Sequence, residues 1–203
     1  MTYRRIACLG LALALLPPFR ASATTVEAPE FKELVGLADY VVRGVVVSIS
    51  SEWRQTPDGH SYIATQVELE VQDVIRGQPP ASVVLDMLGG RVGEHELRVE
   101  GAPQFLIGDE GVFFVQGNGR LLSPLVGIMH GVYPILHDFN SGQDYVLRSN
   151  GMPLYSEQDV SLPMTRLSAV KVKNPAARPI TADAFIRSVR QTAAETKPHA
   201  VEN

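Results

Sequence analysis

Cysteine is nearly absent from this sequence. The chain of 203 residues has one, Cys8, and it lies inside an apolar run close to the N-terminus. If that run is a leader that is cut off, the remaining chain has no cysteine. The shortage then excludes structural disulfides, a CxxC redox pair, a thiol nucleophile and any cysteine-ligated metal. The folded protein must therefore be stabilised by packing.

Positive charge is also scarce. The 18 basic residues are outnumbered by 22 acidic ones, which gives a formal charge of −4. Loss of Arg4, Arg5 and Arg20 with a leader would leave 15 against 22, a charge of −7. An acidic surface argues against nucleic acid as a partner, and it leaves no polybasic patch for anionic membranes.

Long apolar runs are missing except at the N-terminus. There Ile6–Leu16 is uncharged and follows Arg4 and Arg5. As a helix it would span about 16 Å, roughly half of a bilayer core, which disfavours a transmembrane anchor. Pro17-Pro18 and the small residues Ala21-Ser22-Ala23 come next. This order predicts a secretory signal peptide over residues 1–23, hence a periplasmic or extracellular protein with no membrane span after cleavage.

Motifs for catalysis and cofactors are absent as well. The sequence has no G-x-S-x-G, no H-E-x-x-H and no phosphate-binding glycine loop. One S-x-x-K pair, Ser168 and Lys171, lies in a proline-rich stretch without its companion motifs. Asp138 and Asp144 flank a turn that would hold calcium only weakly, and such residues are ordinary in turns. We therefore expect no metal, no cofactor and no catalytic residue.

What the sequence does contain is alternation typical of strands. In Ser61–Gly77 the residues Ile63, Thr65, Val67 and Leu69 share one face and polar residues share the other. The stretch Leu37–Ile49 carries apolar residues on both faces, which indicates a strand covered on both sides. Gly44 interrupts it, and a glycine there favours a bend or bulge.

Shorter segments complete an all-β prediction with two helices. Strands are expected over 82–88, closed by Gly89-Gly90, and over 93–101. Hairpins are expected to turn at Asn118-Gly119 and at residues 140–142. A short helix is expected within 28–39, and a second after Thr181, a good N-cap. The predicted organisation is a β-barrel domain over 24–150, an irregular segment with the C-terminal helix packed on it over 151–195, and a disordered tail over 196–203.

The order of these features resembles the netrin-like domains, which include the tissue inhibitors of metalloproteinases. The resemblance rests on "ADYVVRGVVVS" (38–48), "TQVELEVQDVIRG" (65–77) and "GAPQFLIGDEGVFFV" (101–115). It implies an OB-like small β-barrel with an extra hairpin. Those inhibitors chelate metal through an N-terminal cysteine, so their mechanism does not carry over to this chain. The whole chain also resembles exported bacterial proteins whose functions are not known.

Binding is the function class that remains. OB-type barrels bind along one face and through their loops. The loop of residues 51–61 holds the only tryptophan, Trp53, beside Arg54, and both residue types are favoured at interfaces. We predict a recognition surface of Trp53, Arg54, Gly89, Gly90 and Arg91, with a protein or extracellular polymer as partner. The alternative for Trp53 is a structural cap, and the alternative function is a hydrolase of envelope or extracellular polymers.

Overall fold

The computed structural model describes residues 27–164 and 178–196. The predicted signal peptide over 1–23 and the pair Ser168 and Lys171 lie outside the described residues, as does 197–203 of the predicted tail. In the described part of the chain, no helix is long and apolar enough to cross a bilayer.

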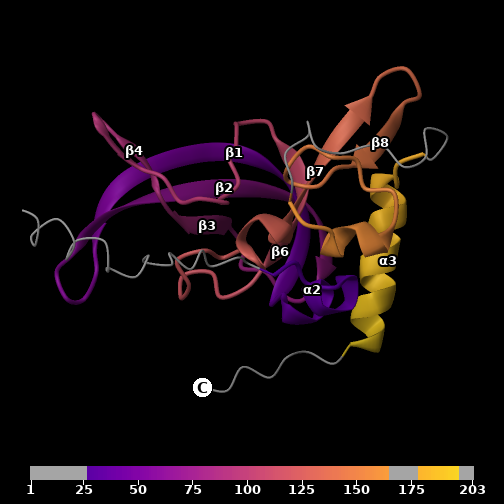
Figure 1. The fold of residues 1–203 in the computed structure, drawn as a ribbon, viewed down its shortest axis with the longest axis horizontal. Helices are drawn as coiled ribbons and strands as arrows, with labels where there is room; N and C mark the ends of the chain where they lie inside the picture. Colours follow the sequence, from indigo (N-terminus) through magenta and orange to yellow (C-terminus); the bar gives the residue numbers. More distant parts are fainter. Residues whose placement is uncertain (1–26, 165–177, 197–203) are drawn as a thin grey trace, which may run out of the picture.

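The described chain is mostly β-structure, with one six-stranded antiparallel sheet and two helices. In chain order the elements are α2 (Phe31–Leu37), β1 (Tyr40–Gln55), β2 (Ser61–Arg76), β3 (Val83–Leu88), β4 (Gly90–Val92), β5 (His95–Leu97), β6 (Glu110–Val115), the 3₁₀ helix η2 (Ile128–Gly131), β7 (Val132–Asp138), β8 (Gln143–Val146), the 3₁₀ helix η3 (Glu157–Ser161) and α3 (Ala182–Glu195). The sheet order is β3-β2-β1-β6-β7-β8, and β4 and β5 form a separate hairpin. Figure 1 shows α2 and α3 together at one end, with the far halves of β1 and β2 extending away from them.

The first strand bends where the sequence places its glycine. β1 pairs with β2 along its whole length, but with β6 only from Tyr40 to Val45. The register against β2 shifts between Arg43 and Gly44, as predicted. A Cβ atom on Gly44 would lie 3.0 Å from the carbonyl oxygen of Glu70. Glycine therefore permits the close approach of β2 that accompanies the bend.

The sheet is buried on both faces near α2, which confirms the two-sided prediction for β1. Val41 belongs to a cluster with Leu34 of α2 and Phe185 of α3. Its neighbour Val42 belongs to a second cluster with Leu85 and Phe113. Adjacent strand residues point to opposite faces, so one short stretch of β1 supports both clusters.

The C-terminal helix closes the first cluster. Thr181 caps it as predicted, because its Oγ1 accepts a hydrogen bond from the amide of Ala184 at 3.3 Å. The ring of Phe185 lies 5.0 Å from Tyr133 and 6.2 Å from Phe114, measured between ring centroids. α3 therefore packs on side chains from β6 and β7.

Four expectations differ from the structure. The loop expected over 51–61 is limited to residues 56–60, because β1 runs to Gln55 and β2 begins at Ser61. The strand order ends at β3 and β8, so an antiparallel sheet is shown and closure of an OB-type barrel is not. The turn at Asn118-Gly119 is followed by no strand, since β6 ends at Val115 and residues 120–122 lie in turns or bends. β3 ends at Leu88, directly before Gly89-Gly90, as predicted, but the strand expected over 93–101 is only His95–Leu97.

Candidate functional site

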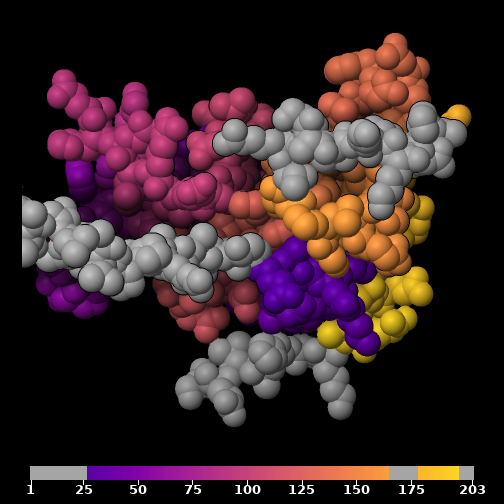
Figure 2. All heavy atoms as spheres, viewed as in Figure 1, coloured from indigo at the N-terminus to yellow at the C-terminus, as the bar shows by residue number. Residues whose placement is uncertain are grey.

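A cavity of about 710 Å³ lies over the far half of the sheet, which we call the groove. Its floor comes from β1, β2 and β3, and its cover comes from the β4–β5 hairpin and the segment after it. Figure 2 shows this cover standing over β1 and β2, away from the helices. The lining residues are Ile49, Ser51, Thr65, Val67, Met87, Leu88, Gly89, Gly90, Arg91, Glu96, Leu97, Arg98, Val99, Glu100, Ala102, Pro103, Gln104 and Phe105.

Two hydroxyl groups on the floor form a directed chain. Thr65 Oγ1 donates to the carbonyl oxygen of Gly89 at 2.6 Å, which uses its only proton. Ser51 Oγ, 2.8 Å from Thr65 Oγ1, must therefore be the donor in their shared hydrogen bond. Ser51 keeps free lone pairs but no free proton. A ligand that reaches it must donate a hydrogen bond.

Gly90 lies directly over this pair of hydroxyls. Its φ is +132°, and a Cβ atom there would lie 2.1 Å from Thr65 Oγ1 and 2.6 Å from Ser51 Oγ. Both the backbone conformation and the space restrict the position to glycine. Gly90 therefore allows the hairpin to approach the floor closely.

The rim of the groove is charged but balanced. Arg91 donates to Glu96 at 2.9 Å, and Arg98 donates to the other oxygen of the same carboxylate at 2.5 Å. These hydrogen bonds, the one from Arg91 first, lower the pKa of Glu96. With Glu100 also on the lining, two arginines face two glutamates. The rim therefore favours no ligand of one particular charge.

The structure brings most of the predicted site residues together. Gly89, Gly90 and Arg91 line the groove. The ring of Trp53 lies 5.5 Å from that of His95 on β5, in an edge-to-face arrangement, and 49% of the residue is exposed. Trp53 therefore stands beside the hairpin that covers the groove.

Arg54 is the predicted residue that the structure places elsewhere. Neighbouring strand residues point to opposite faces, so Arg54 lies on the side of the sheet away from Trp53. Its Nε donates to Glu52 at 2.9 Å, and it also forms an ion pair with Asp86 of β3. Trp53 and Arg54 do not form one surface.

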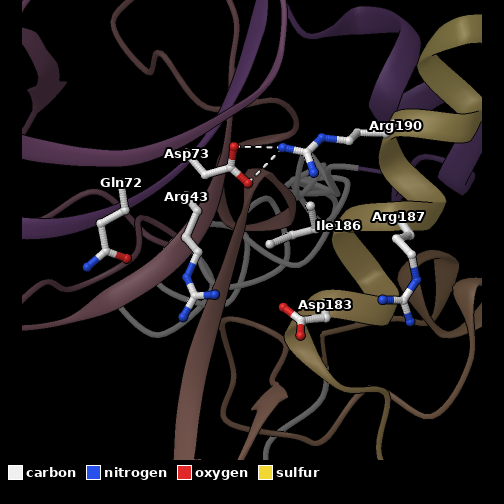
Figure 3. A pocket seen from close by; sticks show the side chains of 7 residues that line it. All are labelled: Arg43, Gln72, Asp73, Asp183, Ile186, Arg187 and Arg190. Atoms are coloured by element: carbon white, nitrogen blue, oxygen red, sulfur yellow. Dashed lines mark hydrogen bonds and ion pairs between the residues drawn. The ribbon is translucent and has the colours of Figure 1, made fainter.

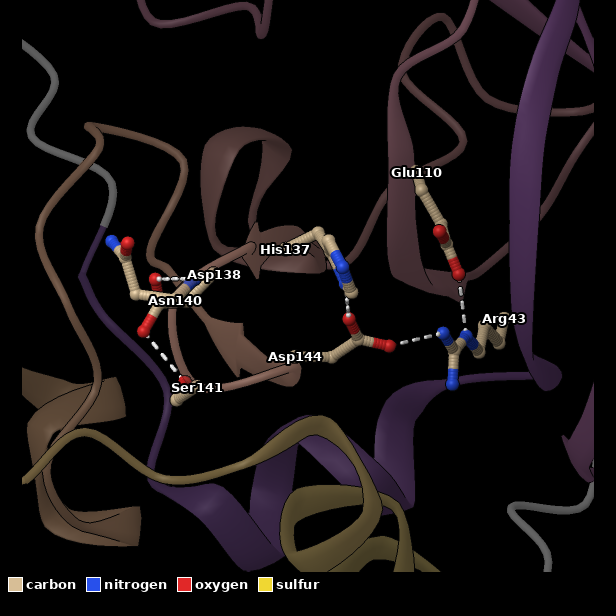
Figure 4. A network of polar contacts seen from close by, with 7 residues as sticks. All are labelled: Arg43, Glu110, His137, Asp138, Asn140, Ser141 and Asp144. Carbon is tan, nitrogen blue, oxygen red and sulfur yellow. Dashed lines mark hydrogen bonds and ion pairs between the residues drawn. The ribbon is translucent and has the colours of Figure 1, made fainter.

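A second polar feature crosses four strands of the sheet (Figure 4). Arg43 of β1 pairs with Glu110 of β6 at 2.6 Å and with Asp144 of β8 at 3.0 Å. Asp144 also lies 2.6 Å from Nδ1 of His137 on β7. The hydrogen bond with His137, and next that with Arg43, lowers the pKa of Asp144. Among the described residues no hydroxyl group forms a hydrogen bond with His137, so His137 and Asp144 form no catalytic triad there.

The oxygen ligands considered for calcium are used within the protein. Asp138 accepts from the amide of Asn140 at 3.0 Å and from the hydroxyl of Ser141 at 2.6 Å. Asp144 instead faces His137 and Arg43 (Figure 4). In residues 27–164 and 178–196 no cluster of three or more histidine and carboxylate side chains is arranged to hold a metal.

A smaller cavity of about 260 Å³ lies between β2 and α3. Arg190 of α3 holds both oxygens of Asp73 at 2.6 and 2.8 Å, and Arg43 and Asp183 also line the space (Figure 3). The ion pair ties the helix to the sheet. The charged groups of this ion pair are partly exposed. We therefore interpret the cavity as a packing contact between α3 and the sheet rather than as a ligand site.

Sequence reasoning missed a buried group of polar side chains. His130 and Arg148 are buried, and Tyr133 has no exposed surface. Arg148 donates to the carbonyl oxygens of Leu162 and Pro163. Burial, followed by the charge of Arg148, lowers the pKa of His130. An arginine that follows a strand usually indicates the surface, so the sequence held no signal for this burial.

No protein-family model matches the sequence, and a search of curated proteins finds no match either. The resemblance to netrin-like domains therefore stays a prediction. The groove, with Trp53 and Gly89–Arg91 around it, is the candidate site that geometry alone supports best.

Proposed function

We propose that this is an exported, non-enzymatic binding protein of the cell envelope or extracellular medium, and that the groove is its binding site. The observation that carries the proposal is the cavity of about 710 Å³, a volume within the usual range for ligand pockets. Its floor is largely apolar, with Ser51 as an acceptor, and its rim has balanced charge. The partner should offer an apolar group together with a hydrogen-bond donor.

The proposal includes closure of the sheet into an OB-type barrel. The β3-β2-β1 meander and the antiparallel addition of β6 to β1 support it. OB-type barrels bind ligands along one face and through connecting loops, which is where the groove lies. Hydrolysis of envelope or extracellular polymers is the weaker alternative, because the His137–Asp144 pair has no nucleophile bonded to it in the described residues.

The test is affinity capture from the native secreted and envelope fraction. Leu97 lines the groove and is only partly exposed, so Leu97→Glu would place a carboxylate in the apolar lining without opening the core. We expect it to reduce capture by about tenfold or more, because a buried charge without a partner opposes apolar binding.

The matched control is Leu136→Glu on β7, where the leucine is 52% exposed. This variant should capture the partner as the unaltered protein does. Normal capture by Leu97→Glu together with loss in Leu136→Glu would move the site to the segment around β7 and would refute the groove.

A further inference from the structure

In the described part of the chain, the far half of β1 has no strand paired with its side away from β2. β6 pairs with β1 only as far as Val45, while β2 pairs with it to Gln55. At Val46 the loop before β6 takes over, because Val46 exchanges backbone hydrogen bonds with Gly108 and Asp109. From Ser48 to Gln55, no described residue forms a backbone hydrogen bond to this outer side. We call this stretch the open edge.

The hydrogen bonds of β2 show which residues of β1 face the open edge. The carbonyl oxygen of Ile63 in β2 accepts from Gly89, on the side of β3. Its partner Trp53 therefore receives no ladder bond from β2 and directs its own amide and carbonyl outward. By the same alternation Ile49, Ser51 and Gln55 also face outward. Ile49 and Ser51 line the groove, so the open edge and the groove share residues.

The other long edges of the sheet are covered. On β3, the amide group of Asn118 donates to Val84 and accepts from the amide of Asp86, and Leu122 accepts from Leu88. On β8, the amide of Val146 donates to Ile180. Native proteins usually protect a sheet edge in this way, because unpaired strands recruit other chains. An edge left open beside a cavity is therefore suited to recruitment.

We propose that the open edge pairs with an extended segment of a partner polypeptide, which adds as a strand beside β1 and places apolar side chains at the groove. The inference rests on the proposed function and names its partner class. Backbone amides and carbonyls of Ile49, Ser51 and Trp53 match the groups of an extended chain. Their side chains are uncharged, so alternate uncharged residues of the partner would lie against them.

A second copy of this protein fits the edge less well. Its own Trp53 already packs on His95, and its Ile49 belongs beside its own core, so neither can enter the groove of a neighbour. Two short edges alone also bury less than the roughly 800 Å² per partner of a stable interface. An unfolded segment is not restricted in this way, because its side chains are free to enter the groove.

The test compares Ser51→Pro with Ser51→Ala. Both remove the hydroxyl, but only proline removes the outward amide, and it leaves the bonds to β2 intact. The probe is a peptide of about ten residues selected from a random displayed library against the full chain. Its affinity is followed through the emission of Trp53, the only tryptophan. We expect Ser51→Pro to bind about tenfold more weakly than Ser51→Ala, because both lack the hydroxyl and only proline also lacks the outward amide.

Hydrogen exchange on the unaltered protein supplies a readout that does not depend on how the proline variant folds. The amides of Ser51, Trp53 and Gln55 should exchange quickly when free and slowly with the peptide bound. Equal binding by both variants, no selected peptide, or unchanged exchange would overturn the inference. A dimer that Ser51→Pro dissociates would replace the partner with a second copy. If Leu97→Glu loses capture while one of these results is found, the groove remains the proposed binding site, and only the inference of an added polypeptide strand is refuted.

Discussion

At the scale of single residues, Trp53 is where the groove and the open edge meet. Its backbone faces the edge, and its ring packs edge-on against His95 with half of its surface exposed. It belongs to neither of the two buried clusters. A large aromatic group held in this way contributes more to an interface than to the folded core.

We therefore expect Trp53→Ala to weaken partner capture by about tenfold or more, since an interface tryptophan contributes about 2 kcal/mol. Its melting temperature, measured by circular dichroism, should stay within a few degrees of the unaltered protein. Phe139→Ala is the control, because Phe139 is exposed at the tip of another hairpin. A collapse of the melting temperature would make Trp53 a core residue. If neither property changes, Trp53 lies outside the recognition surface.

Part of this site could be predicted from the residues alone. Turn glycines and a lone tryptophan indicated Gly89–Arg91 and Trp53. The structure places Gly89–Arg91 on the lining of the groove and Trp53 beside the hairpin that covers it. The sequence pattern placed Trp53 and Arg54 together in a loop, but β1 continues to Gln55, and the alternation of strand side chains separates the two residues. The chain from Ser51 through Thr65 to Gly89 could not be predicted, because it depends on the register of three strands.

At the scale of elements, the Arg43 network fastens the β7–β8 hairpin to β1. Asp144 is its central acid, bonded on one side to His137 and on the other to Arg43. These contacts keep the pKa of Asp144 below its ordinary value of 3.8 in the folded protein. An acid with a lowered folded pKa adds stability above its unfolded pKa, and that stability is lost as the pH falls through the folded pKa.

Asp144→Asn should therefore lower the free energy of unfolding by about 1 kcal/mol at neutral pH, the upper range for a partly exposed ion pair. The difference from the unaltered protein should shrink as the pH drops below about 4. Urea unfolding at several pH values measures this. Glu94→Gln, at an exposed glutamate, should keep the original pH dependence. A difference that stays constant down to pH 2 would show that the carboxylate charge is not the cause.

The same scale shows where sequence patterns succeed and fail. The turn between Asp138 and Gln143 was predicted from Asn, Ser and Gly, and β7 and β8 pair across it. The Asn118-Gly119 pair indicated a hairpin equally well, yet the side chain of Asn118 bonds to Val84 of β3 instead. Local turn chemistry does not reveal that a turn residue covers a distant strand edge.

At the scale of the whole molecule, both buried clusters depend on one sheet. Each of two central strands contributes one residue to each cluster. The first cluster contains Val41 of β1 and Phe114 of β6, and the second contains their sequence neighbours Val42 and Phe113. The helices therefore support the half of the sheet from which the groove extends. The class of fold followed from alternation along the strands, but the pairing of β1 with β6 did not, because strand order depends on contacts between segments far apart in the chain.

Because both clusters share one sheet, we expect a destabilising substitution near the helices to lower the stability of the groove as well. Phe185 has no exposed surface and contacts Phe31, Phe114 and Tyr133. Phe185→Ala should lower the free energy of unfolding by about 3–5 kcal/mol and the melting temperature by roughly 10 °C. Unfolding followed by far-ultraviolet circular dichroism and by Trp53 emission should give one shared, lowered midpoint. Phe139→Ala, at a residue 89% exposed, should leave both midpoints unchanged. If Trp53 emission keeps its original midpoint while the dichroism shifts, the two ends of the sheet unfold independently.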